Sequence, residues 1–105
     1  MIEASEAVAQ VIQGRSRHDV DTDLTLRLAI VRAIEVLGEA ASRMSDDGRS
    51  RLPDIPWAAI VGMRNRLTHA YFDIDYDIVW QTAAVEVPSI IGHLRAALGR
   101  DREAR

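Results

Sequence analysis

The stretch that decides the fold is LTLRLAIVRAIEVLGEAASRM, residues 24–44. Its apolar side chains recur every three or four positions, in one stripe of Ile30, Ile34, Leu37, Ala41 and Met44 beside another of Leu24, Leu28 and Val31. This spacing is typical of one face of an α-helix. Asp21, Thr22 or Asp23 is suited to cap its start. The stretch therefore predicts a long helix with a wide apolar face.

A shorter helix is predicted on the N-terminal side of that stretch. Residues from Ile2 to Gln13 carry apolar side chains at helical spacing, and the next residue is Gly14, a common residue just past a helix end. Residues Arg15 to Thr22 are mostly polar and charged. We expect them to form a loop.

Two more helices are predicted on the C-terminal side. The polar run and two prolines between Ser45 and Pro56 indicate a connection, and Pro56 suits the first turn of a third helix that reaches at least Thr68. Acidic caps and a regular stripe then indicate a fourth helix, in which Pro88 is expected to produce a bend. The caps are Asp73, Asp75 and Asp77, and the stripe is Tyr76, Val79, Trp80, Ala83, Val87, Ile90, Ile91, Leu94 and Leu98. We predict an all-α, up-and-down bundle of about four helices.

Length and composition limit the class of protein. The 105 residues are expected to form one domain, residues 1–105, and 48% hydrophobic with 28% charged residues is an ordinary globular composition. No apolar run is long enough to cross a membrane, and nothing after Met1 resembles a secretory signal, so a cytoplasmic location is expected. The absence of cysteine excludes disulfides, thiol catalysis and thiolate metal sites.

The charge distribution bears on nucleic-acid binding. The net charge of −3 argues against an RNA partner, because neutralising phosphates requires basic residues. However, all 13 basic residues are arginine, whose planar fork binds phosphate through two parallel hydrogen bonds. Five of them gather in one stretch: Arg43, Arg49, Arg51, Arg64 and Arg66. A local basic patch is available, although genomic base composition also explains an all-arginine set.

The segment RNRLTHAY, residues 64–71, holds the polar side chains that suggest chemistry. On an ideal helix Arg64 and Tyr71 lie about 20° apart, and Asn65 and His69 lie about 40° apart on a neighbouring ridge. Arg64 and His69 are separated by about 140°, too far to converge on one phosphate from one straight helix. Either the helix ends before His69, or a second copy of the chain contributes.

Together these segments resemble the HepT toxins of the HEPN superfamily. The resemblance rests on Gly38-Glu39-Ala40, Pro53-Asp-Ile-Pro-Trp57, Met63-Arg64-Asn65 with His69 and Tyr71, and Ile78-Val79-Trp80. The Arg-x4-His motif alone is a weak signal, and its combination with the flanking motifs is fairly specific. The predicted first helix is shorter than is usual in such proteins, which raises the expectation of an upstream start codon.

The resemblance implies an HEPN-like fold and an endoribonuclease that works as a homodimer without a metal or cofactor. His69 would then move protons at the ribose 2′-hydroxyl or the leaving oxygen, because histidine titrates near neutral pH. Arg64 would stabilise charge on the phosphorane, and Asn65 would orient His69 or the phosphate. The nucleophile would come from the RNA itself, and the product would be a 2′,3′-cyclic phosphate.

The resemblance also implies a partner. Such toxins are commonly encoded beside a minimal nucleotidyltransferase antitoxin that adds AMP to the motif tyrosine, here Tyr71. The alternative function is a non-catalytic helical module that binds a nucleotidyltransferase or a nucleotide.

Each candidate residue also has a simpler interpretation. His69 is suited to cap a helix, Tyr71 to pack, and Arg64 to pair with Glu35 or Glu39, one turn apart on the long helix. Other residues are expected to have structural roles: Trp57 and Trp80 as core or interface anchors, and Gly38 and Gly62 at close helix contacts. His18 and His93 receive no function.

Overall fold

The computed structural model describes residues 1–69 and 73–103, and every regular element in those ranges is a helix. Four long helical segments make up the fold: α1 (Ile2–Ile12), α3 (Leu24–Ser42), α5 (Trp57–His69), and the continuous run of α6 (Tyr76–Gln81), a π-helical turn (Thr82–Glu86) and α7 (Val87–Glu103). The predicted all-α fold with about four helices is confirmed.

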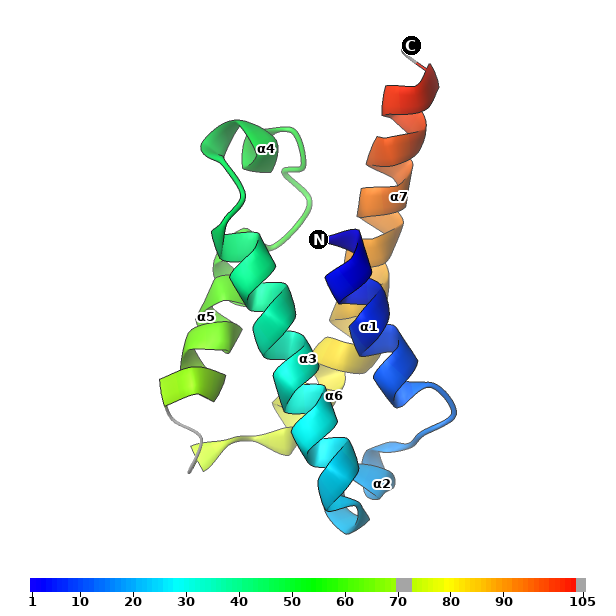
Figure 1. Cartoon of the computed structure of the whole chain (residues 1–105), viewed down its shortest axis with the longest axis vertical. Coiled ribbons are helices and arrows are strands. Elements are labelled where there is room, and N and C mark those ends of the chain that lie inside the picture. The colour runs from blue at the N-terminus through cyan, green and yellow to red at the C-terminus, as the bar shows by residue number, and fades with distance from the viewer. Residues whose placement is uncertain (70–72, 104–105) are drawn as a thin grey trace.

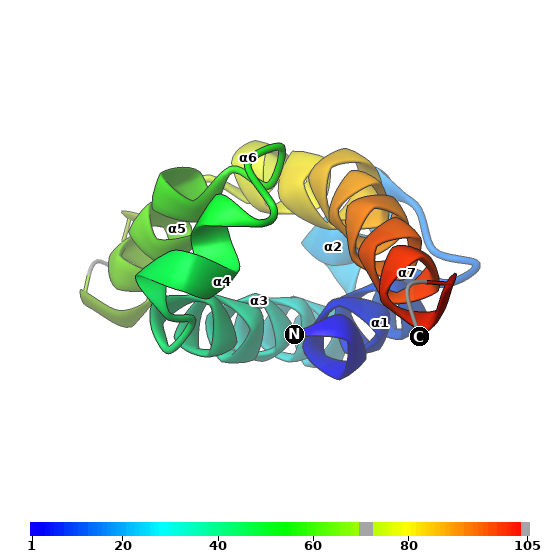
Figure 2. The same ribbon diagram turned by 90° about the horizontal axis from the view of Figure 1, so that it is seen from above.

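The helices lie side by side in a thin bundle. α3 lies between α5 and α1, and α1 also packs against α7 (Figure 2). The Cα atoms extend over 48 × 29 × 16 Å, and the C-terminal end of α7 projects beyond the other helices (Figure 1). None of the helices in the described part of the chain is both long and apolar enough to cross a bilayer.

The two predicted stripes of α3 are buried to different extents. Ile30, Ile34, Leu37 and Ala41 are buried, and they pack with apolar side chains from α1, α5, α6 and α7. Leu24 and Leu28, by contrast, are 59% and 63% exposed. Burial of a large aliphatic side chain contributes about 1.5–3 kcal/mol, so the Ile30 stripe fixes how α3 faces the bundle. Leu24 and Leu28 are left on the surface, while Val31 of the same stripe is half-buried against the core.

The predicted loop at Arg15–Thr22 is wrong, because a short helix, α2 (Arg17–Thr22), forms there. Ser16 and Asp19 make a capping box in which each side chain accepts a hydrogen bond from the other residue's backbone N–H. The bond from the Ser16 backbone lowers the pKa of the Asp19 carboxyl. Val20 supplies the single apolar anchor and is fully buried.

The connection between α3 and α5 also contains a helical turn, α4 (Asp46–Ser50), capped by Ser45. Arg49 folds back from α4 and donates a hydrogen bond from Nη2 to the Ala41 carbonyl, 3.0 Å away near the end of α3. Its guanidinium lies over the Trp57 ring, 5.7 Å from the centroid. Arg49 therefore joins the end of α3 to the start of α5.

The last helical run changes geometry just before Pro88. The π-helical turn ends there, and the Val87 N–H bonds to the Thr82 carbonyl, five residues back. Pro88 has no N–H to continue the α-helical ladder. The bend expected at Pro88 takes the form of this π turn.

Candidate active site

Arg64 lies at a close contact between α5 and α3. A Cβ built on Gly38 would overlap the Cβ of Arg64 and lie 2.8 Å from its Cγ, so a side chain at position 38 does not fit. Gly38 is buried, and the aliphatic stem of Arg64 fills the space above it. The predicted close contact at Gly38 is confirmed, and it fixes the position of the Arg64 side chain.

The Arg64 guanidinium reaches the surface beside a carboxylate of α3. Nη1 lies 3.5 Å from Oε2 of Glu39, and the arginine side chain is 25% exposed. Its Nε is buried and has no hydrogen-bond partner among the described residues. The other oxygen of Glu39, Oε1, accepts a hydrogen bond of 3.2 Å from Nε of Arg43. Of the two carboxylates predicted to pair with Arg64, Glu39 is the one that does.

A small groove of about 230 Å³ opens at this point on the α3–α5 seam. Its walls are Arg32, Glu35, Val36, Glu39, Arg64 and Thr68. A second hollow of about 350 Å³ adjoins it, because Glu35 and Thr68 line both. The second hollow has an apolar wall that includes the exposed Leu24 and Leu28. The Arg64 groove therefore combines charged groups with an adjoining apolar surface.

The other predicted site residues are placed differently from Arg64. α5 remains helical as far as His69, and Asn65 and His69 are both exposed and line neither hollow. The separation of about 140° between Arg64 and His69 therefore applies to a real, unbroken helix. One chain does not bring the two side chains together. Tyr71 lies outside the described residues.

Two features of the groove were not anticipated from the sequence. Arg32 and Thr68 are part of its wall, and Arg43 bonds to one of its carboxylates. A sequence signal for the arginines exists: residues 32, 36, 39 and 43 follow the spacing of one helical ridge. The predicted contact at Gly62 is wrong, because a Cβ there would meet nothing within 4 Å.

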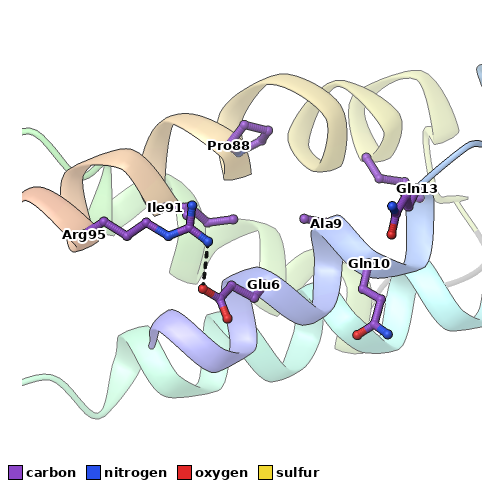
Figure 3. A pocket seen from close by; sticks show the side chains of 8 residues that line it. Glu6, Ala9, Gln10, Gln13, Pro88, Ile91 and Arg95 are labelled. Carbon is purple, nitrogen blue, oxygen red and sulfur yellow. Dashed lines mark hydrogen bonds and ion pairs between the residues drawn. The ribbon is translucent and has the colours of Figure 1, made fainter.

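A larger hollow, about 680 Å³, lies elsewhere, between α1 and α7. Figure 3 shows its two walls, with Gln10 on α1 and Pro88 on α7 and the Glu6–Arg95 ion pair of 3.0 Å spanning one end. It holds no histidine and no predicted site residue. Elsewhere, His18 is exposed on α2 and His93 borders a hollow of about 60 Å³. No group of three or more potential metal ligands gathers among the residues that the structure describes.

Comparisons with known proteins point to one family. The sequence profile "Ribonuclease HepT-like" matches residues 1–97. The chain is 33% identical over 90 residues to "Probable ribonuclease HepT" of Thermococcus cleftensis, which covers 86% of this chain and 82% of that protein. It is also 33% identical over 90 residues to "Putative RNase MJ1380" of Methanocaldococcus jannaschii, covering 86% and 83% of the two chains. A third relative, "Putative RNase TTE0752" of Caldanaerobacter subterraneus, is 30% identical over 102 residues, 97% of this chain and 91% of that one.

No solved structure matches the chain significantly. The profile and the relatives agree over nearly the whole length, from α1 into α7. The chain therefore belongs to the HepT-like ribonuclease family.

Proposed function

We propose that this chain is the toxin of a toxin–antitoxin pair and cleaves RNA, without a metal ion, at a site built by two copies. One observation carries the composite site: Arg64 and His69 stand on one unbroken helix, yet only Arg64 lines the groove. A partner chain is the simplest source of a histidine facing Arg64. Membership of a ribonuclease family supports RNA as the substrate.

The proposed chemistry uses the RNA itself as nucleophile. His69 accepts the proton of the ribose 2′-hydroxyl as the 2′-oxygen attacks the adjacent phosphorus, and protonated imidazole returns a proton to the departing 5′-oxygen. Arg64 stabilises the added negative charge on the phosphorane with its guanidinium, and Asn65 orients the phosphate or the imidazole. The products are a 2′,3′-cyclic phosphate and a free 5′-hydroxyl. Every bond change is supplied by the RNA and these side chains.

The surface of α3 supports a second copy as the partner. Three of its large apolar side chains are exposed, Leu24 at 59%, Leu28 at 63% and Val36 at 42%, and all three line the two hollows beside Arg64. Apolar side chains grouped in this way are typical of protein interaction surfaces. Dimerisation through this surface would place a second α5 close to the Arg64 groove.

The catalytic proposal is tested by RNA cleavage in the presence of EDTA. Purified parent protein should cut RNA, while Arg64→Ala and His69→Ala should lose at least about 100-fold in rate, the usual scale for a lost acid–base or oxyanion group. His18→Ala is the matched control, since His18 is exposed on another helix, and it should retain full activity. Circular dichroism checks that each variant stays folded. Full activity of His69→Ala would refute the catalytic assignment, and cleavage only without EDTA would refute metal independence.

Control by a nucleotidyltransferase antitoxin is the second part of the proposal, with Tyr71 as the modified residue. AMP on its hydroxyl would bring a phosphate to the motif that contains Arg64, where it would compete with RNA for the guanidinium. Co-expression with the neighbouring nucleotidyltransferase should add one or more AMP units, located at Tyr71 by peptide mapping. Tyr71→Phe should cleave RNA and escape silencing. An adduct on the half-buried Tyr76 instead would support the partnership and reject the choice of tyrosine.

The alternative proposal is a non-catalytic helical module that binds a nucleotidyltransferase or a nucleotide. Both proposals allow the chain to bind the transferase, so binding does not separate them. RNA cleavage does: a module of this kind would leave RNA intact under every condition, with or without EDTA.

A further inference from the structure

Two guanidinium groups share one carboxylate at the edge of the Arg64 groove. Oε2 of Glu39 lies 3.5 Å from Nη1 of Arg64, and Oε1 of the same carboxylate accepts a bond of 3.2 Å from Nε of Arg43. Glu39 thus occupies the place of an anion between two arginines. A phosphate group, with more acceptor oxygens and the same sign of charge, suits that place as well.

The two arginines differ in how firmly they are held. The stem of Arg64 is fixed against Gly38, with its Nε buried. Arg43 is the residue that follows the last turn of α3, and its side chain bonds to Glu39 but is 78% exposed. Arg64 therefore provides a preorganised binding group, whereas Arg43 is free to turn toward a ligand that approaches from solvent.

The local charge favours an anion. The groove wall contains two guanidiniums and two carboxylates, and Arg43 at its edge adds one positive charge. Arg32 neutralises the charge of Glu35, 3.7 Å away. The two remaining guanidiniums, of Arg43 and Arg64, face only the single charge of Glu39. One positive charge remains in this cluster, and one backbone phosphate carries one negative charge.

We propose that Arg43 is a second RNA-binding residue, and that a backbone phosphate replaces the Glu39 carboxylate between Arg43 and Arg64. This inference rests on the proposed ribonuclease function and adds a phosphate contact outside the Arg-x4-His motif. The carboxylate that the phosphate replaces then acts as an internal competitor of RNA. Removing its charge strengthens binding, and removing Arg43 weakens it.

The exchange is energetically reasonable. Exposed ion pairs contribute little to stability, and Glu39 is 46% exposed with a separation of 3.5 Å from Arg64, too long for a strong hydrogen bond. Arginine–phosphate contacts are charge-assisted and form two parallel bonds. The protein therefore loses little when a phosphate displaces Glu39, and both guanidiniums gain stronger contacts.

The chain provides a matched control pair. Arg51 and Asp47 form another exposed i,i+4 pair on α4, 3.1 Å apart, and neither residue lines the Arg64 groove. Arg51→Ala removes the same charge as Arg43→Ala, and Asp47→Asn removes the same charge as Glu39→Gln. General effects of net charge on RNA binding are thereby separated from effects of the shared carboxylate.

The experiment measures binding of a fluorescent, fully 2′-O-methylated RNA of mixed sequence, which has no free 2′-hydroxyl and is not cleaved. Anisotropy titrations at several salt concentrations give the affinity and its salt slope. Arg43→Ala should weaken binding about fivefold or more relative to Arg51→Ala and reduce the salt slope by about 1, as expected for one lost phosphate contact. Glu39→Gln should tighten binding by up to about fivefold relative to Asp47→Asn.

The outcomes distinguish this inference from the function on which it rests. If the parent binds RNA and the Arg43→Ala and Arg51→Ala variants bind it with equal affinity, Arg43 contacts no phosphate. This result would overturn the inference and leave the proposed function intact. Weaker binding by Glu39→Gln would show that the carboxylate holds Arg64 in place and does not compete with RNA, which also overturns it. A folded parent chain that binds no RNA and cleaves none would overturn both. Circular dichroism confirms the fold of every variant.

Discussion

Gly38 determines how closely α5 approaches α3, because its missing side chain makes room for the stem of Arg64. The contact involves Cβ and Cγ of Arg64, atoms close to the backbone of α5, so a methyl group at position 38 moves the helix and not merely a flexible side-chain end. Gly62 is on the same α5 helix with open space around it. Position 38 therefore has no room for a side chain, whereas position 62 has room for one.

Replacing each glycine with alanine tests this difference. Gly62→Ala should raise the free energy of unfolding by about 0.5–1 kcal/mol, because alanine loses less backbone entropy in a helix. Gly38→Ala should lower it by about 1–3 kcal/mol, the usual cost of overpacking, and should reduce RNA cleavage by displacing Arg64. Urea unfolding followed by circular dichroism gives both values. Equal effects of the two substitutions would contradict the close packing at Gly38.

Part of the site was predictable because helical spacing alone places some side chains. The angular separation of Arg64 from His69 follows from their positions along one regular helix, and the sequence limited the expected partner of Arg64 to Glu35 or Glu39, of which Glu39 forms the pair. The error at Gly62 has a physical reason: the spacing gives the face on which a residue lies but not the distance to the neighbouring helix. The sequence grouped Arg43 with Arg64 in a basic patch, but the carboxylate that they share was not predictable, because it depends on where α5 brings Arg64.

Short side-chain caps determine where the helices begin. The Asp23 side chain accepts a hydrogen bond of 3.1 Å from the Leu26 N–H, and its backbone ends α2 and starts α3. Its φ of −126° and ψ of 101° are extended, so the chain turns a corner at this residue. The direction of α3, and with it the position of the Arg64 groove, depends on this corner.

The cap at Asp23 can be separated from its charge. Asp23→Ala should lower the free energy of unfolding by about 1 kcal/mol, the usual cost of losing an N-cap. Asp23→Asn should lower it much less, because asparagine caps as well as aspartate, although both variants lose the ion pair of 3.5 Å with Arg15. Thermal or urea unfolding measures the difference. If the Asp23→Asn and Asp23→Ala variants were equally destabilised, the ion pair with Arg15 and not the cap would be the stabilising interaction.

The long helices were predictable from the sequence, and the two short ones were not. α3 and α5 carry apolar side chains at helical spacing over several turns, which is a strong signal. α2 and α4 contain five or six mostly polar residues each and begin at the serine caps Ser16 and Ser45. Their helical turns depend on the caps and on one contact each, Val20 in the core and Arg49 against α3. Neither contact is visible as a periodicity.

The molecule as a whole is a flattened bundle of helices with an apolar patch on α3. Its shortest dimension is 16 Å, and its radius of gyration of 14.2 Å exceeds the value of about 13 Å expected for a compact chain of this length. In this shape the face of α3 that carries Leu24, Leu28 and Val36 remains exposed. Association of two copies would bury this surface.

Dimerisation should therefore depend on α3. Light scattering of the parent should give twice the chain mass of 11.7 kDa, and Leu28→Glu should give the single mass, because a carboxylate opposes burial of that surface. Val85→Glu is the matched control: Val85 is 53% exposed on the π turn and lines neither hollow beside Arg64, so this variant should remain dimeric. A parent that stays monomeric and still cleaves RNA would rule out the composite site.

Mixing two inactive variants tests whether the site is shared. In a mixed dimer of Arg64→Ala and His69→Ala chains, one of the two sites regains both side chains if each site takes one residue from each chain. Each mixed dimer should regain up to about half of the activity of a parental dimer, because one of its two sites is complete. Random pairing of the two chains also forms inactive homodimers, so the activity of the whole mixture is lower in proportion to their share. No recovery, with mixed dimers demonstrated by mass spectrometry, would mean that both residues act from one chain.

The π turn at Thr82–Glu86 is a position where the chain can lose one residue without a change in the fold. Its wider loop holds about one more residue than an α-helical turn would over the same rise, so the helix carries a surplus residue just before Pro88. Loss of one residue here would let the helix continue as a regular α-helix, with the faces of α6 and α7 still directed as they are now. A single-residue deletion at the start of α7, before Ile90, would rotate the buried Ile90 and Leu94 by about 100° out of the core. Natural deletions between relatives are thus best accommodated at this turn.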